Sequence, residues 1–252
     1  MVNKKRIQSH FARAAATYDR QAVIQRRVAE RLISLLDPNC MRPPRGVLEI
    51  GCCTGMLTER LLQKYREINA LFVNDIVPEF RTMVLPRLPG DCNPVFLAGD
   101  IESIDLPPDL DLVISSSTFH WLEDLPALLA KLAVQMSPES TLCFTIYSTG
   151  NFHELREITG TGLDYYSAAG LRTLVEQHFT VLSCEEEMIT FYFDDPLHLL
   201  HHLRETGVNA LDTPAWTRSR LNEFTGAYAE RFGCREGVPL TYHPVYCTAR
   251  KT

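Results

Sequence analysis

The segment from residue 47 to residue 62 constrains the fold more than any other part of this chain. It begins with a short apolar run that contains Glu49 and continues through a turn framed by Gly51 and Gly55. A helical pattern then runs from Met56 to Leu62. A strand that leads through such a turn into a helix places backbone N–H groups at the carboxyl edge of a parallel sheet, where open α/β folds bind ligands.

The spacing of the two glycines distinguishes between classes of cofactor. A dinucleotide fingerprint needs G-x-G-x-x-G, but its third glycine would fall on Met56. The pattern instead resembles the first motif of class I S-adenosylmethionine (SAM) methyltransferases, an acid followed by G-x-G-x-G, with Cys53 in place of the middle glycine. Glycine frees the backbone dihedrals at that position. The cysteine is therefore expected to keep a negative φ and to hold its sulfur aside.

Length and composition fit one α/β domain with an insertion or a small lid. The chain has 252 residues, of which 45% are hydrophobic and 22% are charged, as in ordinary globular proteins. No apolar run approaches the ~18 residues of a membrane span, and no apolar segment follows the basic N-terminus as in a secretory signal. The eight cysteines contain no C-x-x-C pair, so reduced thiols in a cytoplasmic protein are expected.

Positive charge is concentrated at the N-terminus. Residues 1–31 carry eight lysines and arginines against two acids, a local charge of +6, although the whole chain carries −6. One interpretation is a solvated helix face, and the other is a docking surface for an acidic partner.

Apolar periodicity predicts two helices before the first strand. Ile7, Phe11 and Tyr18 recur at helical spacing, and Asp19 is expected to start a second helix that ends at residues 37–38. Further apolar runs alternate with helical patterns and predict a mostly parallel sheet with right-handed crossovers. The expected later strands are residues 70–75, 94–102, 110–117, 140–147, 181–193 and 240–249, with helices over 125–134, 171–179, 195–205 and 217–232.

The predicted fold class is therefore α/β, with a Rossmann-like, mostly parallel seven-stranded sheet and helices on both faces. Three parts are expected. Residues 1–45 form N-terminal helices that cover the cofactor site, 46–194 and 237–252 form the SAM-binding core, and 195–236 form a helical substrate lid.

Acids end the second and third predicted strands. Asp75 can accept hydrogen bonds from both hydroxyls of a ribose, or it can cap the next helix. Asp100 can accept a hydrogen bond from an adenine amino group with Ile101 packed on the ring, or it can simply close a turn.

Small polar and aromatic residues follow the fourth strand. The serines at 115–117 are expected to line the methionine end of the cofactor, and residues 119–121 to border the methyl group. His120 is either a substrate contact or a core residue. Three histidines at 198, 201 and 202 have spacings used in zinc sites, but no cysteine pair or third ligand accompanies them, so no metal is predicted.

Eight short segments, spread over nearly the whole chain, resemble those of one enzyme family. They are residues 7–19, 49–52, 74–76, 99–102, 119–122, 193–195, 204–211 and 240–244. Several are SAM motifs shared with unrelated methyltransferases, whereas the N-terminal segment, Gly-Val-Asn-Ala-Leu at 207–211 and Leu-Thr-Tyr-His at 240–243 are more specific. Through them the chain resembles the malonyl-acyl-carrier-protein O-methyltransferases of biotin synthesis.

The resemblance implies methyl transfer from SAM to the free carboxylate of a malonyl thioester on acyl carrier protein. It places Tyr18 over the methionine part of SAM, Asp75 and Ile76 at the ribose, and Asp100 with Ile101 at the adenine. The other predicted cofactor residues belong to the glycine loop and the serine run: Glu49, Gly51, Cys52, Gly55, Ser115 and Ser116.

The implied reaction needs no general base, because a carboxylate with a pKa near ~4 is already ionised at neutral pH. It needs in-line positioning in a site shielded from water. Arg204 is the predicted orienting residue, since a guanidinium can hold one carboxylate oxygen and leave the other free to attack; the alternative is a surface helix arginine. Further substrate contacts are predicted at His120, Tyr147, Asn209, Tyr242 and His243.

The basic N-terminal segment matches the implied partner, because acyl carrier proteins are acidic. Arg26, Arg27 and Arg31 are predicted to dock the carrier. The enzyme is expected to act as a cytoplasmic monomer, without a membrane or nucleic acid.

Two other functions remain open. One is methylation of a different acceptor, such as trans-aconitate, another small acid or a quinone precursor. The other is a SAM-binding sensor that does not catalyse methyl transfer. The feature that supports this alternative is Cys53, which replaces the middle glycine of the motif. Nucleic-acid methylation is disfavoured, because the chain is acidic and the fourth strand ends in Ser-Ser-Ser and not in an Asn/Asp-Pro-Pro-Tyr motif.

Overall fold

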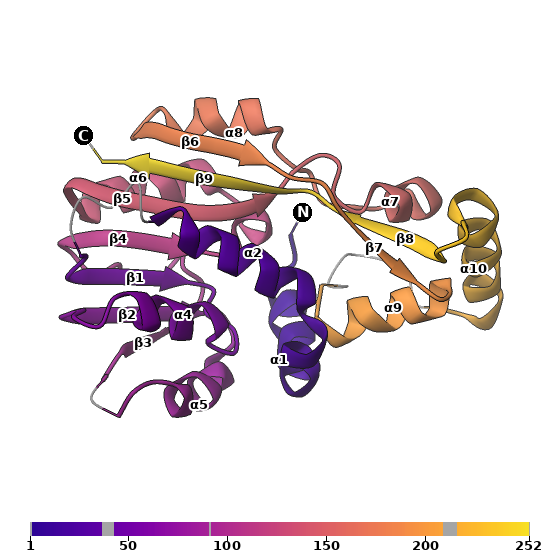
Figure 1. The fold of residues 1–252 in the computed structure, drawn as a ribbon, viewed down its shortest axis with the longest axis horizontal. Coiled ribbons are helices and arrows are strands. Elements are labelled where there is room, and N and C mark those ends of the chain that lie inside the picture. The colour runs from indigo at the N-terminus through magenta and orange to yellow at the C-terminus, as the bar shows by residue number, and fades with distance from the viewer. Residues whose placement is uncertain (1, 37–42, 91, 209–215, 252) are drawn as a thin grey trace.

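A computed structural model describes residues 2–36, 43–90, 92–208 and 216–251. Its centre is a seven-stranded sheet with the order β3-β2-β1-β4-β5-β9-β6 (Figure 1). The strands are β1 (Gly46–Ile50), β2 (Ala70–Asp75), β3 (Val95–Ala98), β4 (Leu110–Ser115), β5 (Met136–Tyr147), β6 (Thr180–Glu186) and β9 (Pro244–Arg250).

The first five strands are parallel, and β9 is antiparallel to both of its neighbours. This confirms the predicted fold class. From β1 the chain builds outward through β2 and β3, and then returns to the other side of β1 with β4 and β5. Ligands of open α/β sheets bind at the point where the order reverses, beyond the carboxyl ends of the strands.

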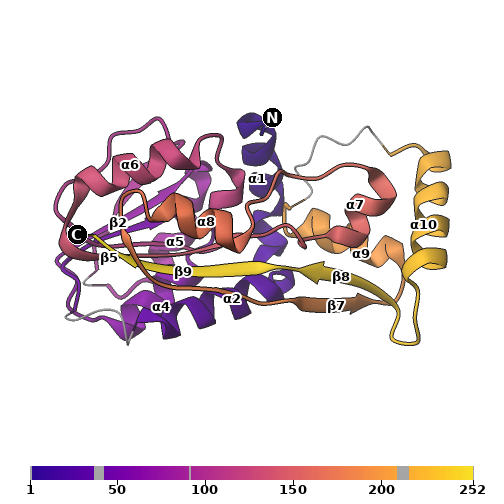
Figure 2. The ribbon, with the colours of Figure 1, turned by 90° about the horizontal axis from the view of Figure 1, so that it is seen from above.

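Helices cover both faces of this sheet (Figure 2). One face packs against α6 (Leu125–Gln135) and α8 (Ala168–Val175), and the other against α2 (Val23–Ser34) and α4 (Met56–Lys64). Successive side chains of β4 point to opposite faces of the sheet. Val113 packs in the hydrophobic cluster under α6 and α8, whereas Leu112 and Ile114 pack in the cluster under α2 and α4. The core thus fixes the register of the strands whose ends form the site.

The N-terminal helix α1 (Lys4–Gln21) lies at the carboxyl ends of the strands. Asn3 caps it, since its side chain accepts a hydrogen bond from Arg6 N at 3.0 Å. The prediction that Asp19 starts the second helix is wrong, because α1 continues through Asp19 and α2 begins after Ala22. The Asp19 carboxylate is used for tertiary contacts instead. It accepts a hydrogen bond from Thr54 Oγ1 at 2.5 Å and pairs with Arg87.

The two long C-terminal strands predicted from the sequence are each interrupted. β6 ends before β7 (Ile189–Phe193), and His243 separates β8 (Val238–Tyr242) from β9. β7 and β8 pair with each other as a two-stranded ribbon that extends beyond the main sheet (Figure 1). The third predicted strand is also shorter, since β3 ends at Ala98, just before Gly99 with a φ of +132°.

The two helices expected in the insertion lie between β7 and β8 in the chain. They are α9 (Pro196–Glu205), capped by Asp195, and α10 (Arg218–Phe232), capped by Thr217. Two further α-helices in the described ranges are α5 (Arg81–Val84) and α7 (His153–Thr159). None of the helices in the described ranges is long and apolar enough to cross a membrane.

Candidate cofactor site and acceptor chamber

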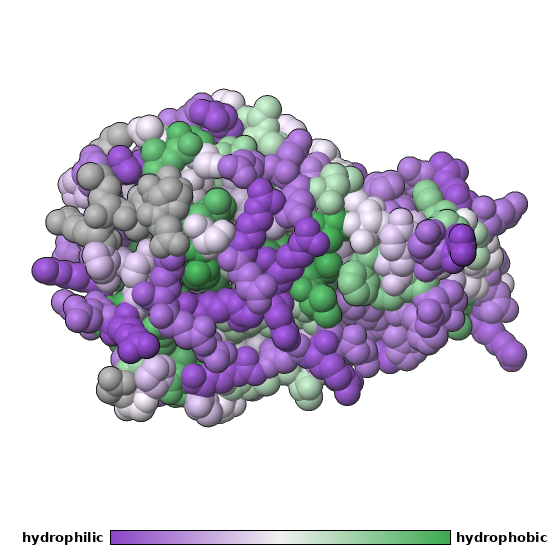
Figure 3. All heavy atoms as spheres, viewed as in Figure 1, coloured by the Kyte–Doolittle hydropathy of each residue, from purple (hydrophilic) through white to green (hydrophobic). Residues whose placement is uncertain are grey.

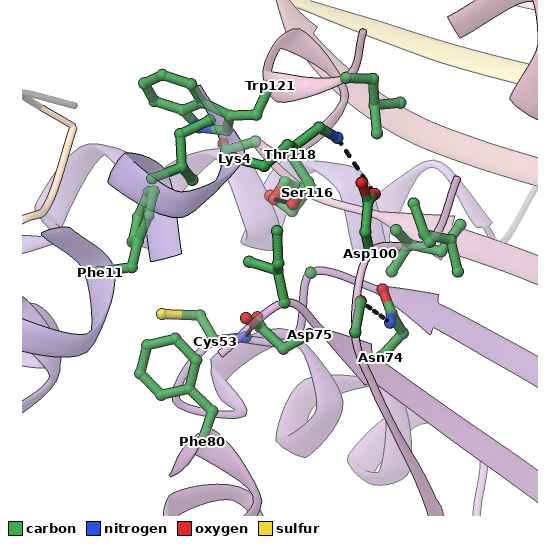
Figure 4. A pocket seen from close by; sticks show the side chains of 18 of the residues that line it. Lys4, Phe11, Cys53, Asn74, Asp75, Phe80, Asp100, Ser116, Thr118 and Trp121 are labelled. Atoms are coloured by element: carbon green, nitrogen blue, oxygen red, sulfur yellow. Dashed lines mark hydrogen bonds and ion pairs between the residues drawn. The ribbon is translucent and has the colours of Figure 1, made fainter. Parts of the chain in front are cut away.

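A cavity lies at the carboxyl ends of the parallel strands, against the inner face of α1 (Figure 4). Its empty space is about 650 Å³, part of it open to solvent, which suits a small-molecule site. Seven predicted cofactor residues line it: Tyr18, Gly51, Asp75, Ile76, Asp100, Ile101 and Ser116.

The glycine loop fits closely against its neighbours. Gly51 has a φ of +74°, and a Cβ atom there would lie 2.1 Å from the Thr118 hydroxyl oxygen. The backbone N–H groups of Gly51 and Cys52 both donate to Asn74 O at 2.9 Å. Gly55, with a φ of +89°, caps α4. Only glycine is compatible with the first position, because it needs both the left-handed φ and the close approach.

Cys53 differs from the expectation. Its φ is +47° and its side chain lines the cavity, so the predicted negative φ and averted sulfur are wrong. The left-handed conformation costs an L-residue about 1 kcal/mol. The Cys53 N–H donates to Asp75 Oδ2 at 2.8 Å, which holds the residue in this conformation. Figure 4 shows the sulfur between the rings of Phe11 and Phe80.

Four predicted cofactor residues lie behind the cavity wall. Cys52 packs in the core cluster beneath α2 and α4, and Ser115 Oγ donates to Ile50 O at 2.8 Å. Gly55 opens α4, as described above, and does not line the cavity. Glu49, the fourth, is fully buried, and neither carboxylate oxygen has a hydrogen-bond partner within the described part of the chain. Burial raises its pKa to about 8.

Asp75 lies at the end of β2 with both carboxylate oxygens engaged. Oδ2 accepts from Cys53 N, and Oδ1 accepts from Val77 N at 2.9 Å. Burial raises its pKa to about 6, although these backbone hydrogen bonds oppose the change. A carboxylate has about four acceptor positions, so it can also accept from two hydroxyl groups. The capping and ribose-binding interpretations are therefore compatible.

Lys4 closes the end of the cavity where adenine was predicted. Its Nζ lies 3.2 Å from Asp100 Oδ1, and it also forms an ion pair with Glu102. Ile101 is buried beside this group. Sequence reasoning missed Lys4, because 96 residues separate it from Asp100 and no local pattern connects them.

Other lining residues were also missed. Phe11 of α1 meets Trp121 edge-on with ring centroids 6.0 Å apart, and a Cβ atom on Gly207 would lie 3.0 Å from the Phe11 ring. Asn74 donates from its side-chain amide to Leu97 O and Gly99 O. Figure 4 shows Asn74 beside Asp100 on one side of the cavity, away from Phe11.

A second, larger chamber shares a wall with the first. It has about 1990 Å³ of empty space, part of it open solvent, and Ile7, Trp121 and Leu122 line both. Two predicted substrate residues, His120 and Tyr147, line this chamber. Their rings lie 4.9 Å apart, edge to face.

The other predicted substrate residues within the described ranges line neither cavity. Arg204 is exposed on α9, and its Nη2 bonds to His201 Nδ1 at 2.8 Å, so the structure does not bring it to the second chamber. The Tyr242 hydroxyl bonds to His202 Nε2 at 2.8 Å in the core. His243 Nδ1 accepts from Gly150 N. Asn209 lies outside the described residues.

Two of the three predicted docking arginines form internal ion pairs. Arg27 and Arg31 both pair with Glu187, and Arg31 also reaches Glu185 at 2.9 Å. Arg26, by contrast, donates to the backbone oxygen of Asp19. Figure 3 shows hydrophilic atoms over the middle of this face, where α2 crosses the sheet in Figure 1. The charges of Arg27 and Arg31 are thus compensated within the protein.

Comparison with known proteins agrees with this geometry. A model described as a methyltransferase domain matches residues 48–144. A putative methyltransferase of Bacillus halodurans has the same fold, with a TM-score of 0.64, 11% identity, and coverage of 88% of this chain and 99% of that one. A putative methyltransferase of Haloferax volcanii has a TM-score of 0.63 at 18% identity, with 97% of each chain covered.

Relatives over the full length are more specific. A protein of Chlorobium luteolum is 38% identical over 100% of this chain and 97% of its own. One of Bacteroides thetaiotaomicron is 34% identical over 99% of each. Both are called malonyl-[acyl-carrier protein] O-methyltransferase. The chain therefore belongs to the malonyl-[acyl-carrier protein] O-methyltransferase family.

Proposed function

We propose that this protein transfers the methyl group of SAM to the free carboxylate of malonyl-acyl carrier protein. The observation that supports this most directly is the pair of chambers that meet at Trp121. One has the position and residues of a SAM site, and the other is large enough for a thioester arm. The names of the full-length relatives agree with the substrate.

The residues of the first cavity fit SAM, which carries an ammonium group and a sulfonium. Glu49 and Asp75 are buried acids at the glycine loop, and a bound cation would favour the ionised form of the buried Glu49 carboxyl group. In this assignment Asp75 holds the ribose hydroxyls, and Asp100 with Ile101 holds the adenine. Tyr18 and Ser116 lie against the methionine part. Bound SAM would supply an electrophilic methyl group for the transfer.

The remaining chemistry is positioning and exclusion of water. The acceptor carboxylate is ionised at neutral pH and needs no base. His120 does not act as one, because burial lowers the pKa of its imidazole to about 3 and leaves a very weak base. Phe11 and Trp121 exclude water from the shared wall, so the carboxylate and the methyl donor meet in a region of low dielectric constant.

The site of the acyl carrier protein remains a proposal. Arg26 is the strongest of the predicted docking residues, because its guanidinium pairs with no acid in the described chain. Arg27 and Arg31 contribute less, since Glu185 and Glu187 already neutralise them. We also propose that residues 195–236 act as the lid and residues 1–45 as the cofactor cover. Free thiols on seven described cysteines support a reducing, cytoplasmic setting, and we retain a monomer as the working state.

The direct test is transfer of tritium from methyl-labelled SAM, with malonyl-acyl carrier protein and free malonate in parallel. The expected result is base-labile label on the carrier, with far less on malonate, since a methyl ester is hydrolysed by base. Equal label on free malonate would keep the chemistry and reject the carrier as the specific substrate. SAM binding without transfer to either would reject the proposal.

A further inference from the structure

Residues 160–166 all line the second chamber, and Arg156 of α7 packs against them. The carbon of its guanidinium lies 5.6 Å from the centre of the Tyr165 ring. A Cβ atom on Gly162 would lie 2.8 Å from Arg156 Cγ and Cδ, so the side chain follows the backbone of this segment closely. Its Nη1 donates to Thr149 O at 2.9 Å. The charge of Arg156 is left without a countercharge, since no acid in the described ranges pairs with it.

Arg156 is partly exposed and has further hydrogen atoms to donate. A guanidinium has five N–H groups in one plane, and here one nitrogen is used for Thr149 O. The contact with the Tyr165 ring and the close fit against Gly162 hold the group in place before any ligand binds. Such a planar fork binds a phosphate or a carboxylate through two parallel hydrogen bonds. Arg156 is therefore a preformed anion site beside the chamber.

A second unpaired arginine borders the same segment. A third cavity, with about 700 Å³ of empty space that is partly open to solvent, lies between the end of α7 and α10. Thr161 lines both this cavity and the second chamber. Arg220, exposed on α10, also lines the third cavity and pairs with no acid of the described chain. Of the acids nearby, Glu157 is already paired with Arg231, whereas Glu223 lines the third cavity without an ion pair to Arg220.

The two arginines lie away from the place of methyl transfer. Figure 2 shows α10 beside α7, and the chain that leaves α7 runs toward α1 before it turns into α8. The wall shared with the cofactor cavity is formed by Ile7, Trp121 and Leu122. Residues 158–166, which are all described, do not line the cofactor cavity. The unpaired positive charges therefore adjoin a different part of the second chamber.

The acceptor of the proposed function carries an anion at each end of its flexible part. The malonyl carboxylate is at one end, and at the other end a phosphodiester joins the phosphopantetheine arm to the carrier protein. Because the carboxylate has to reach the shared wall at Trp121, the phosphodiester lies the length of the arm away from that wall. The positions of the two unpaired arginines fit this second anion.

We infer that Arg156 and Arg220 bind the phosphodiester of the carrier's phosphopantetheine arm, which enters the second chamber past Thr161. This rests on the proposed function. Holding the arm at a fixed point sets how far the malonyl group reaches, so the contact that recognises the carrier also positions the carboxylate. Asp164, exposed on the same segment, pairs with neither arginine. Asp164 and Glu223 lower the positive potential around the two guanidinium groups, so a bound anion is held by direct hydrogen bonds to them.

Competition between two fragments of the arm tests this inference. Phosphopantetheine retains the phosphate, and pantetheine differs from it only by the absence of that group. Each fragment is added to the labelled transfer reaction with malonyl-acyl carrier protein, and its inhibition constant is measured. We expect phosphopantetheine to inhibit the wild type at least about tenfold more strongly, with a smaller difference at high salt because exposed charges are screened. Equal inhibition by both fragments, or inhibition by neither, overturns the inference.

Single substitutions show whether the arginines are responsible. Arg156→Gln and Arg220→Gln should each lose most of the preference for phosphopantetheine and raise KM for malonyl-acyl carrier protein about tenfold, with an unchanged Kd for SAM. Arg156→Lys keeps the charge and should retain part of the preference. Arg235→Gln, at an exposed arginine beyond the other end of α10, is the matched control and should behave as wild type.

A purely structural role of Arg156 would give a different pattern. If Arg156→Gln weakens inhibition by both fragments equally, the residue only supports the wall formed by residues 160–166, and the inference is overturned. If the wild type transfers no labelled methyl group to the carrier, the proposed function fails. If transfer occurs but the wild type does not distinguish the two fragments, only this inference fails.

Discussion

Glu49 should make the stability of the ligand-free protein fall as pH rises. Its carboxyl group is fully buried, and this burial raises its pKa from the ordinary 4.5 to about 8, although the neighbouring Thr58 hydroxyl opposes the change. The folded state therefore holds a proton that the unfolded state releases. Stability is fully present below pH 4.5 and is lost as pH rises through about 8.

The size of the effect follows from the displacement of the pKa. At about 1.4 kcal/mol per pH unit, the change from 4.5 to about 8 corresponds to a loss on the order of 5 kcal/mol. Asp75 also lowers the free energy of unfolding as pH rises, but over a lower pH range, because burial raises its pKa from 3.8 to about 6. Glu49→Gln removes the ionisable group, so the variant should retain only the loss due to Asp75 and other acids.

The assay is urea unfolding of ligand-free wild type and Glu49→Gln at intervals from pH 5 to pH 9. The free energy of unfolding of the wild type should fall more steeply with pH, and the variant should be the more stable protein at pH 9. Glu59→Gln, on the same loop-and-helix unit but hydrogen-bonded to Gln63, is the control and should follow the wild type. Equal pH slopes for wild type and Glu49→Gln would refute the reasoning. Saturating SAM should reduce the slope of the wild type, since a cation nearby favours the ionised carboxylate.

Other changes test the remaining parts of the site. Lys4→Met leaves Asp100 and Glu102 without their shared partner and should weaken SAM binding about tenfold by calorimetry, whereas Lys5→Met, exposed on the same helix, should not. Cys53→Gly should change the unfolding free energy by less than about 1 kcal/mol, because relief of the left-handed strain offsets the greater freedom of unfolded glycine; loss of about 2 kcal/mol or more would contradict this. Arg26→Glu should raise KM for the carrier substrate several-fold with unchanged stability. Arg31→Glu should lower the melting temperature, since it places another acid beside Glu185, which loses its partner, and Glu187, which keeps only Arg27.

Residues at strand ends could be predicted well from the sequence. Gly51, Asp75 and Asp100 each follow an apolar run, and in a parallel sheet all such ends meet at one edge. Their mutual position follows from the order of the strands alone. The same argument located Ser116, which also lines the cavity.

Residues whose positions depend on the path of a distant element could not be predicted. Lys4 and Phe11 reach the cavity because α1 lies across it, which depends on contacts such as Gln8 with Ile76 O and Thr17 with Glu205 O. Arg204 is predicted to orient the acceptor because a guanidinium can hold one carboxylate oxygen and leave the other free. Its actual place depends on the direction of the β7–β8 ribbon, which the uninterrupted apolar pattern of residues 181–193 conceals.

The segment between β6 and β9, which contains that ribbon, is placed so that it could be inserted or removed as one unit. Glu187 N, where the chain leaves the main sheet, donates to Pro244 O, where it returns, at 3.0 Å. The whole excursion thus starts and finishes at adjacent points on two strands that are antiparallel neighbours. Removing it and joining β6 to β9 through a short turn would give an ordinary hairpin and leave all seven strands in place. A chain built in this way can acquire, lose or replace the residues between β6 and β9 by a single in-frame event, while the seven strands of the main sheet are inherited unchanged.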